Sequence, residues 1–175
     1  MMMTERNNVV TFKGNALTLV GPELKIGEKA PDFCVIANDM SEMTMQQTSK
    51  KMRLLISVPS LDTPVCDMEV RRFNEEAAKM DNVEVIVISM DLPFAQSRWC
   101  GAQGIEAVKT VSDHRDGNFG MQYGVMVKEL RLNARAIFVV DANDMLVYQE
   151  IVPEMTHEPN YEAALKAISQ QVAMV

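Results

Sequence analysis

The chain has 175 residues and a formal net charge of −7, with 47% hydrophobic and 23% charged residues. This composition is typical of one globular domain over residues 1–175, and it excludes a disordered, collagen-like or disulfide-scaffold chain. Because no excess of Lys and Arg is available to neutralise phosphates, a nucleic-acid partner is not expected. No apolar run reaches the roughly 20 residues of a membrane span, and the N-terminus lacks the apolar core of a secretory signal. We therefore expect no membrane association and a cytoplasmic location.

The N-terminal part of the sequence contains short β-prone runs that are separated by turn residues. Val9–Phe12 and Leu17–Val20 flank Lys13-Gly14-Asn15, a pattern that predicts a β-hairpin over about residues 9–20. The chain is then broken at Gly21-Pro22, and Phe33–Ala37 is predicted to be a short strand.

The middle of the chain has the pattern strand, helix, strand. Leu54–Val58 and Val83–Met90 are compact apolar runs. Between them, apolar residues recur at steps of four, three, four and three, at Cys66, Val70, Phe73, Ala77 and Met80. This spacing places one apolar stripe on a helix, and a connection of this length favours a parallel strand pair with a right-handed crossover. A second helix is predicted to begin near Pro93 and to end around Gly101–Gly104.

The last third opens with a poorly patterned stretch, residues 110–133. Two strands are predicted after it, Ala136–Val140 and Met145–Val152, and the short turn between them makes this pair antiparallel. A closing helix is predicted from about Asn160. A sheet with both kinds of pair and with helices over it gives the expected fold class, a three-layer α/β/α sandwich with a mixed sheet and an N-terminal hairpin.

The residues before Cys66 predict a helix start that would affect its thiol. Thr63 is suited to the N-cap position and Pro64 to the first helical position, which makes Cys66 the third helical residue. There its sulfur would lie near unpaired backbone N–H groups at the positive end of the helix dipole, an environment that favours the nucleophilic thiolate. From the residues alone two interpretations stay open: a reactive thiol, or a small buried apolar side chain on the helix stripe.

Several segments resemble one known family. Pro59-x-x-x-Thr63-x-x-Cys66 resembles the active-site signature of the peroxiredoxins, thioredoxin-fold enzymes that reduce hydroperoxides. Further segments are similar to the bacterial thiol peroxidase branch of that family: Ser60–Cys66, Asp91–Gly101, Asn133–Ala136 and Glu158–Leu165. Two departures are visible, because Trp99 stands where the branch has Phe, and the stretch from Val127 to Asn133 is shorter and lacks a Gly-Pro pair.

The resemblance implies a role for each matching residue. Cys66 corresponds to the peroxidatic cysteine, which becomes a sulfenic acid, and Cys100 to the resolving cysteine of the same chain. Thr63 and Arg135 correspond to the side chains that orient and activate the thiolate and the peroxide. Pro59 corresponds to the residue that shields the sulfur, and its lack of an N–H group suits that position.

The resemblance also implies an activity. The implied activity is that of a thioredoxin-like thiol peroxidase, which would reduce hydrogen peroxide and organic hydroperoxides to water and alcohols through a Cys66–Cys100 disulfide. No bound cofactor or metal is expected. Electrons are expected from thioredoxin, and behind it from NADPH, and a homodimer is expected. The alternatives are a thiol–disulfide oxidoreductase, which usually carries Cys-x-x-Cys, and a non-catalytic protein in which the disulfide switches an interaction surface.

A disulfide between Cys66 and Cys100 has a structural requirement. The two residues are predicted on separate helices, whereas a disulfide needs Cα atoms within about 7 Å of each other. We therefore expect that the reduced chain holds the thiols apart and that at least one helical turn must unfold before they join.

Overall fold

Segments rich in Val, Ile and Leu form the centre of a seven-stranded sheet in the computed structural model, which describes residues 2–48 and 50–174. The strands lie in the order β11 (Leu146–Ile151), β10 (Ala136–Val140), β5 (Met52–Ser57), β6 (Val83–Ser89), β7 (Lys109–Ser112), β3 (Cys34–Ile36) and β4 (Glu42–Thr44). The β5–β6 and β6–β7 pairs are parallel, and the other pairs are antiparallel. The predicted mixed sheet is therefore confirmed.

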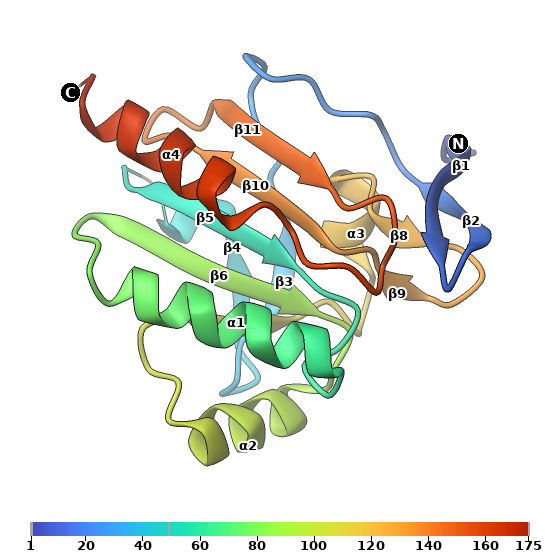
Figure 1. Cartoon of the computed structure of the whole chain (residues 1–175), viewed down its shortest axis with the longest axis horizontal. Helices are drawn as coiled ribbons and strands as arrows, with labels where there is room; N and C mark the ends of the chain where they lie inside the picture. Colours follow the sequence, from blue (N-terminus) through green and yellow to red (C-terminus); the bar gives the residue numbers. More distant parts are fainter. Residues whose placement is uncertain (1, 49, 175) are drawn as a thin grey trace.

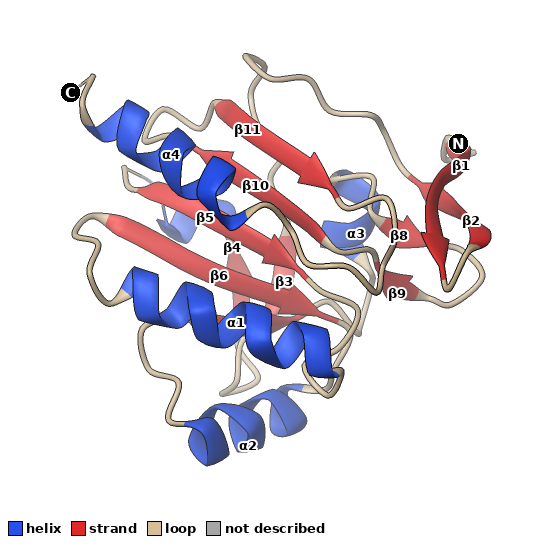
Figure 2. Cartoon of the chain, viewed as in Figure 1, coloured by secondary structure: helices blue, strands red, loops and turns tan. Residues whose placement is uncertain are grey.

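Helices cover both faces of this sheet, as Figures 1 and 2 show. The helical elements are η1 (Met45–Thr48), α1 (Pro64–Ala77), α2 (Pro93–Gln103), α3 (Asn118–Gln122) and α4 (Tyr161–Val172). Helices α1 and α4 share one apolar core with Ile56 of β5, and Trp99 of α2 joins it. The neighbouring residue Leu55 points to the other face, into a second core that contains Phe119 of α3. Two cores on opposite faces of one sheet confirm the three-layer α/β/α sandwich.

The N-terminal hairpin belongs to a second, four-stranded sheet with the order β1 (Glu5–Phe12), β2 (Asn15–Val20), β8 (Met126–Val127) and β9 (Leu132–Asn133). Its turn residues Lys13 and Gly14 have positive φ angles of 50° and 81°, as two-residue hairpin turns favour. The hairpin is bound to the loop after β11, because the Thr11 N–H donates to the Pro153 carbonyl (2.7 Å) and the Gly14 N–H to Glu154 Oε1 (2.8 Å). This contact fixes the hairpin tip at the mouth of the site described below.

The stretch 110–133 is more ordered than its pattern indicated. It contains most of β7 together with α3, β8 and β9, elements of two to five residues that are too short to show a periodicity. The buried Asp113 organises them, because its carboxylate accepts the N–H groups of Phe119 (3.0 Å) and Gly120 (2.8 Å) and the side-chain amide of Asn133 (3.1 Å). The order of this stretch therefore depends on bonds between the residue after its first strand, α3 and β9, which no local periodicity shows.

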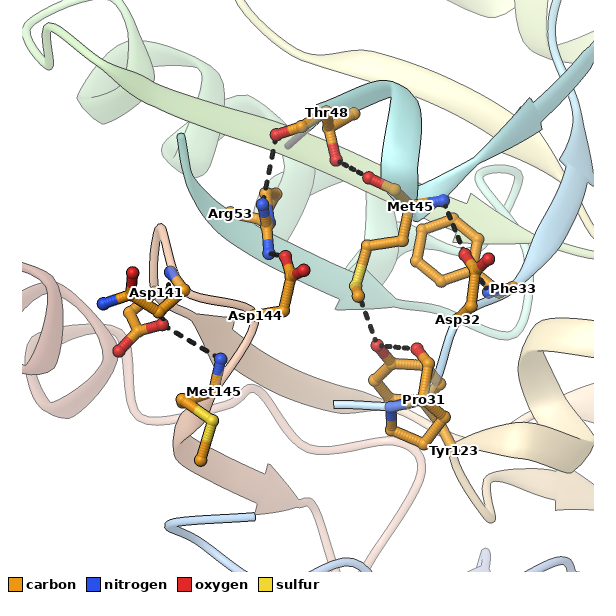
Figure 3. Close-up of polar contacts among 11 residues, drawn as sticks. Pro31, Asp32, Phe33, Met45, Thr48, Arg53, Tyr123, Asp141, Asp144 and Met145 are labelled. Carbon is orange, nitrogen blue, oxygen red and sulfur yellow. Dashed lines mark hydrogen bonds and ion pairs between the residues drawn. The ribbon is translucent and has the colours of Figure 1, made fainter. Parts of the chain in front are cut away.

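A buried arginine lies near the start of β5, at the end of the sheet opposite Cys66. Arg53 of β5 is fully buried, donates to the Thr48 carbonyl (3.1 Å) and forms an ion pair with Asp144 in the β10–β11 turn, as Figure 3 shows. The Arg53 Nε atom has no partner among the described residues. The guanidinium charge therefore depends on one carboxylate.

Replacing that carboxylate should destabilise the fold. The variant Asp144→Asn keeps the shape of the side chain and tolerates the positive φ of 64° at this position, but it leaves Arg53 without its counter-charge. We expect the free energy of unfolding to fall by about 3 kcal/mol, the lower end of the range for a broken buried pair because the Asp144 side chain is 30% exposed. Urea unfolding measures the change. Asp81→Asn, at an exposed position, is the matched control, and equal stabilities of the two variants would contradict the prediction.

Candidate active site

Cys66 lies at the predicted helix start. Thr63 is the N-cap of α1, with φ −86° and ψ 144°, and its hydroxyl oxygen accepts the Cys66 N–H at 3.1 Å. Pro64 occupies the first helical position, so Cys66 is the third helical residue, and it is fully buried. The thiol therefore lies in the first turn of a 14-residue helix, where the backbone dipoles favour a negative charge.

Arg135 brings a positive charge to the same place. It follows β9, is 1% exposed, and donates from Nε (3.2 Å) and Nη2 (2.9 Å) to the Met155 carbonyl. Burial acts to lower the pKa of its guanidinium, but Glu69 and then Cys66 act in the opposite direction, and the pKa is raised overall. Arg135 therefore stays cationic next to Cys66. These bonds and the ion pair with Glu69 use three of its five N–H groups, which leaves two that can serve the Cys66 sulfur and a ligand.

Glu69 is a site residue that the sequence analysis missed. It lies three residues after Cys66 on the buried face of α1, is fully buried, and pairs through Oε2 with Arg135 Nη1. Its other oxygen has no partner among the described residues. Burial raises the pKa of the Glu69 carboxyl to about 7, against the lowering effect of Arg135. The signal in the sequence was the position of Glu69 beside the apolar stripe of the helix. A carboxylate that is buried at such a position needs a partner.

This carboxyl should make stability depend on pH. The folded-state pKa of Glu69, about 7, lies above its ordinary value of 4.5, so between these values the folded chain binds more protons than the unfolded chain. The stabilisation from protonated Glu69 is fully present below about pH 4.5 and is lost as the pH rises through about 7. Denaturant titrations between about pH 5 and pH 8 should show this decline in the wild type and a flatter profile in Glu69→Gln. Identical profiles would contradict the assignment.

A pocket of about 270 Å³ lies against this turn of α1, next to the fully buried Cys66, which does not itself line it. Three of the predicted site residues line it, namely Pro59, Thr63 and Arg135. The remaining lining residues are Phe12 and Lys13 from the hairpin tip, Pro64 and Val65 from α1, and Met155 and Thr156. The hairpin contribution could not be predicted, because it depends on how the hairpin packs against the loop after β11.

The loop that precedes Cys66 is held by Asp91, a second residue whose part the sequence analysis missed. Its carboxylate accepts the Ser60 hydroxyl (2.7 Å), the Leu61 N–H (2.8 Å) and the Ser89 hydroxyl (2.7 Å). Gln96 of α2 extends the network by donating to Ser89 Oγ at 2.9 Å. The ends of β5 and β6 are thereby tied together, and the start of α1 is fixed.

Cys100 lies elsewhere. It is partly exposed on α2, and its sulfur is 3.4 Å from Thr110 Oγ1. It lines a different pocket, of about 370 Å³, together with Asn38 and Met43. Both Cys66 and Cys100 are free thiols, so the structure brings Pro59, Thr63, Cys66 and Arg135 together but not Cys100.

Comparisons with known proteins identify the family of the chain. The Redoxin family profile matches residues 25–165. Thiol peroxidases of Halalkalibacterium halodurans and Bacillus subtilis are 56% and 54% identical to the chain over 158 residues, which is 90% of this chain and 95% of each relative. A solved peroxiredoxin-like protein from Aquifex aeolicus superposes with a TM-score of 0.86 at 43% identity, covering 97% of this chain and 99% of that one.

The profile match over most of the chain places it in the Redoxin family, and its thioredoxin-like sandwich is the fold of that family. Within that family it is a thiol-dependent peroxidase of the peroxiredoxin type, as the identity to thiol peroxidases over most of its length shows. The resemblance stated from the sequence is therefore confirmed. No helix in residues 2–48 and 50–174 is long and apolar enough to cross a membrane.

Proposed function

We propose that Cys66 is the peroxidatic thiol. The observation that carries this proposal is the pocket lined by Pro59, Thr63 and Arg135 at the helix turn that contains Cys66. In the proposed first step the Cys66 thiolate attacks one oxygen of the hydroperoxide, and the O–O bond breaks. Cys66 becomes a sulfenic acid, and the departing oxygen takes a proton to leave as water or an alcohol.

Arg135 acts on this step through charge. Negative charge moves from the Cys66 sulfur to the departing oxygen, so a fixed cation near both atoms stabilises the transition state more than the separated reactants. The bonds from Arg135 to Glu69 and Met155 hold the guanidinium before the substrate arrives. Thr63 fixes the position of the sulfur by capping α1. Pro59 lines the pocket without an N–H group that would compete for the substrate.

Cys100 acts second in the proposed cycle. Its thiol condenses with the Cys66 sulfenic acid, a Cys66–Cys100 disulfide forms, and one water molecule is released. A dithiol of thioredoxin then reduces the disulfide by exchange, with NADPH as the ultimate electron source. Because Cys66 and Cys100 belong to different helices and Cys100 lines another pocket, this step requires a movement of α2 or of the start of α1.

The proposed function also has consequences for the cofactor, the cellular location and the oligomeric state. The chemistry described uses cysteine sulfur alone and calls for no prosthetic group. The cytoplasm is the proposed location, because a reducing compartment maintains free thiols and supplies reduced thioredoxin. A homodimer is proposed on the resemblance to peroxiredoxins.

Peroxide consumption in the presence of thioredoxin, thioredoxin reductase and NADPH tests the function. Many moles of NADPH oxidised per mole of protein, for hydrogen peroxide and for an organic hydroperoxide, are the expected result. Consumption of a single equivalent, with no further turnover, would instead identify a stoichiometric redox-responsive protein. Turnover with a disulfide substrate but not with peroxide would identify a thiol–disulfide oxidoreductase.

A further inference from the structure

A hydrogen bond joins the side chains of two residues that are adjacent in sequence to Cys66 and Cys100. Asp67 follows Cys66, Trp99 precedes Cys100, and Trp99 Nε1 donates to Asp67 Oδ1 at 3.1 Å. The other Asp67 oxygen accepts from Arg71 Nε at 2.9 Å. Arg71 in turn donates to the side chain of Gln103, near the end of α2. A chain of polar bonds therefore ties the first turns of α1 to the second half of α2.

Helix α2 is also attached to the sheet through Gln96, whose side-chain amide donates to Ser89 Oγ (2.9 Å) and to the Val111 carbonyl (2.8 Å). Its N-cap residue, Leu92, makes no side-chain capping bond, and the helix contains Gly101 and ends at Gly104 with φ 65°. Only three of its side chains are buried, those of Pro93, Gln96 and Trp99. Because Trp99 is the only large apolar one among them and directly precedes Cys100, it supplies the main apolar contact of α2 next to Cys100.

A shallow surface pocket of about 300 Å³ lies beside the Trp99–Asp67 bond. Asp67 and Trp99 line it, together with Thr63 and Pro64 from the start of α1. The Cys100 sulfur contacts Thr110 and lines the separate pocket described above. Cys100 must therefore leave Thr110 to meet Cys66, and the Trp99–Asp67 bond restrains the segment that has to move.

We propose that Asp67 and Trp99 are positioning residues that restrain Cys100 and thereby set the rate of disulfide formation. The proposal rests on the proposed function of Cys66 and Cys100. While the Trp99–Asp67 bond is intact, the Cys66 sulfenic acid stays next to the pocket at the start of α1. A second hydroperoxide can then transfer an oxygen to it, giving a sulfinic acid and a second molecule of water or alcohol. When the bond opens, Cys100 condenses with the sulfenic acid, giving the disulfide and water. The Trp99–Asp67 bond thus sets the fraction of Cys66 sulfenic acid that forms the disulfide and the fraction that is oxidised to sulfinic acid.

The variant Trp99→Phe tests the restraint, because it keeps an aromatic side chain in the core and removes the indole N–H donor together with the ring that carries it. Sulfenic acid formation should stay within about twofold of wild type, and disulfide formation should become roughly three- to tenfold faster, as for the net loss of one ordinary hydrogen bond. The sulfinic fraction per turnover should fall by the same factor. Acid-quenched samples analysed by intact-protein mass spectrometry separate the three oxidation states of Cys66.

Asp67→Ala and the double variant complete a mutant cycle. If one bond carries the effect, the double variant should form the disulfide no faster than the faster single variant. The control is Glu76→Ala, which breaks an ion pair with Lys79 (3.1 Å) at the far end of α1 and should change neither step. Unchanged or slower disulfide formation in Trp99→Phe, or additive effects in the cycle, would overturn the proposal. If peroxide produces no Cys66–Cys100 disulfide in the wild type, the proposed function fails instead.

Discussion

Arg135→Ala should slow the reaction of Cys66 with hydroperoxide by about 100- to 1,000-fold, the usual cost of losing one donor that stabilises transition-state charge. The loss should persist at saturating peroxide, because Arg135 is proposed to act on the charge that develops as the O–O bond breaks. Stopped-flow measurement of sulfenic acid formation gives the rate constant directly. Near-normal peroxide kinetics in Arg135→Ala would show that another cation performs this role.

The same substitution also affects stability, and the two effects can be separated. Removing Arg135 leaves the fully buried Glu69 carboxyl without its partner and takes away the group that lowers its pKa, so the carboxyl becomes protonated. The free energy of unfolding should fall by about 1–3 kcal/mol, the cost of an unpaired buried polar group. The double variant Arg135→Ala/Glu69→Gln removes the unpaired carboxyl and should recover part of that stability. It should not recover the rate. Glu69→Gln alone, in which Arg135 is retained, is the matched control, and a double variant that regains both stability and rate would show that Arg135 serves the fold only.

The sequence predicted what depends on local chemistry. The start of α1 could be predicted from Thr63 and Pro64, because helix capping depends on only a few adjacent residues. This prediction placed Cys66 correctly in the first turn of the helix. The end of α2 at Gly104 follows from the freedom of glycine to adopt a positive φ. The long apolar runs of β5, β6 and β10 were found because buried strands need them.

Contacts between distant segments could not be predicted in this way. The pairing of Glu69 with Arg135 joins residues 66 positions apart, and the Met155 carbonyl reaches Arg135 from the loop after β11. Phe12 and Lys13 line the pocket only because the hairpin is bound to that same loop. The residue types that perform chemistry were thus visible in the sequence, whereas the groups that hold them in place required the fold.

The largest expected effect comes from Cys66 itself, and comparison with the other cysteines distinguishes their roles. Cys66 is fully buried, whereas Cys34 and Cys100 are partly exposed. A bulky alkylating reagent would therefore report exposure rather than reactivity. Hydroperoxide is the better probe, because it is small enough to enter the pocket at α1 and because its reduction is the proposed reaction.

Cys66→Ser should abolish peroxide consumption, because a serine hydroxyl is not appreciably ionised at neutral pH and cannot replace the thiolate as nucleophile. Cys100→Ser should consume about one equivalent of peroxide and then stop with thioredoxin as reductant, because its sulfenic acid finds no partner thiol in the chain. Cys34→Ser should turn over as the wild type does. Peroxide loss followed from the first seconds onward separates these outcomes. Thioredoxin-dependent turnover in Cys66→Ser would refute the assignment of the peroxidatic thiol, and sustained turnover in Cys100→Ser would show that thioredoxin reduces the sulfenic acid directly.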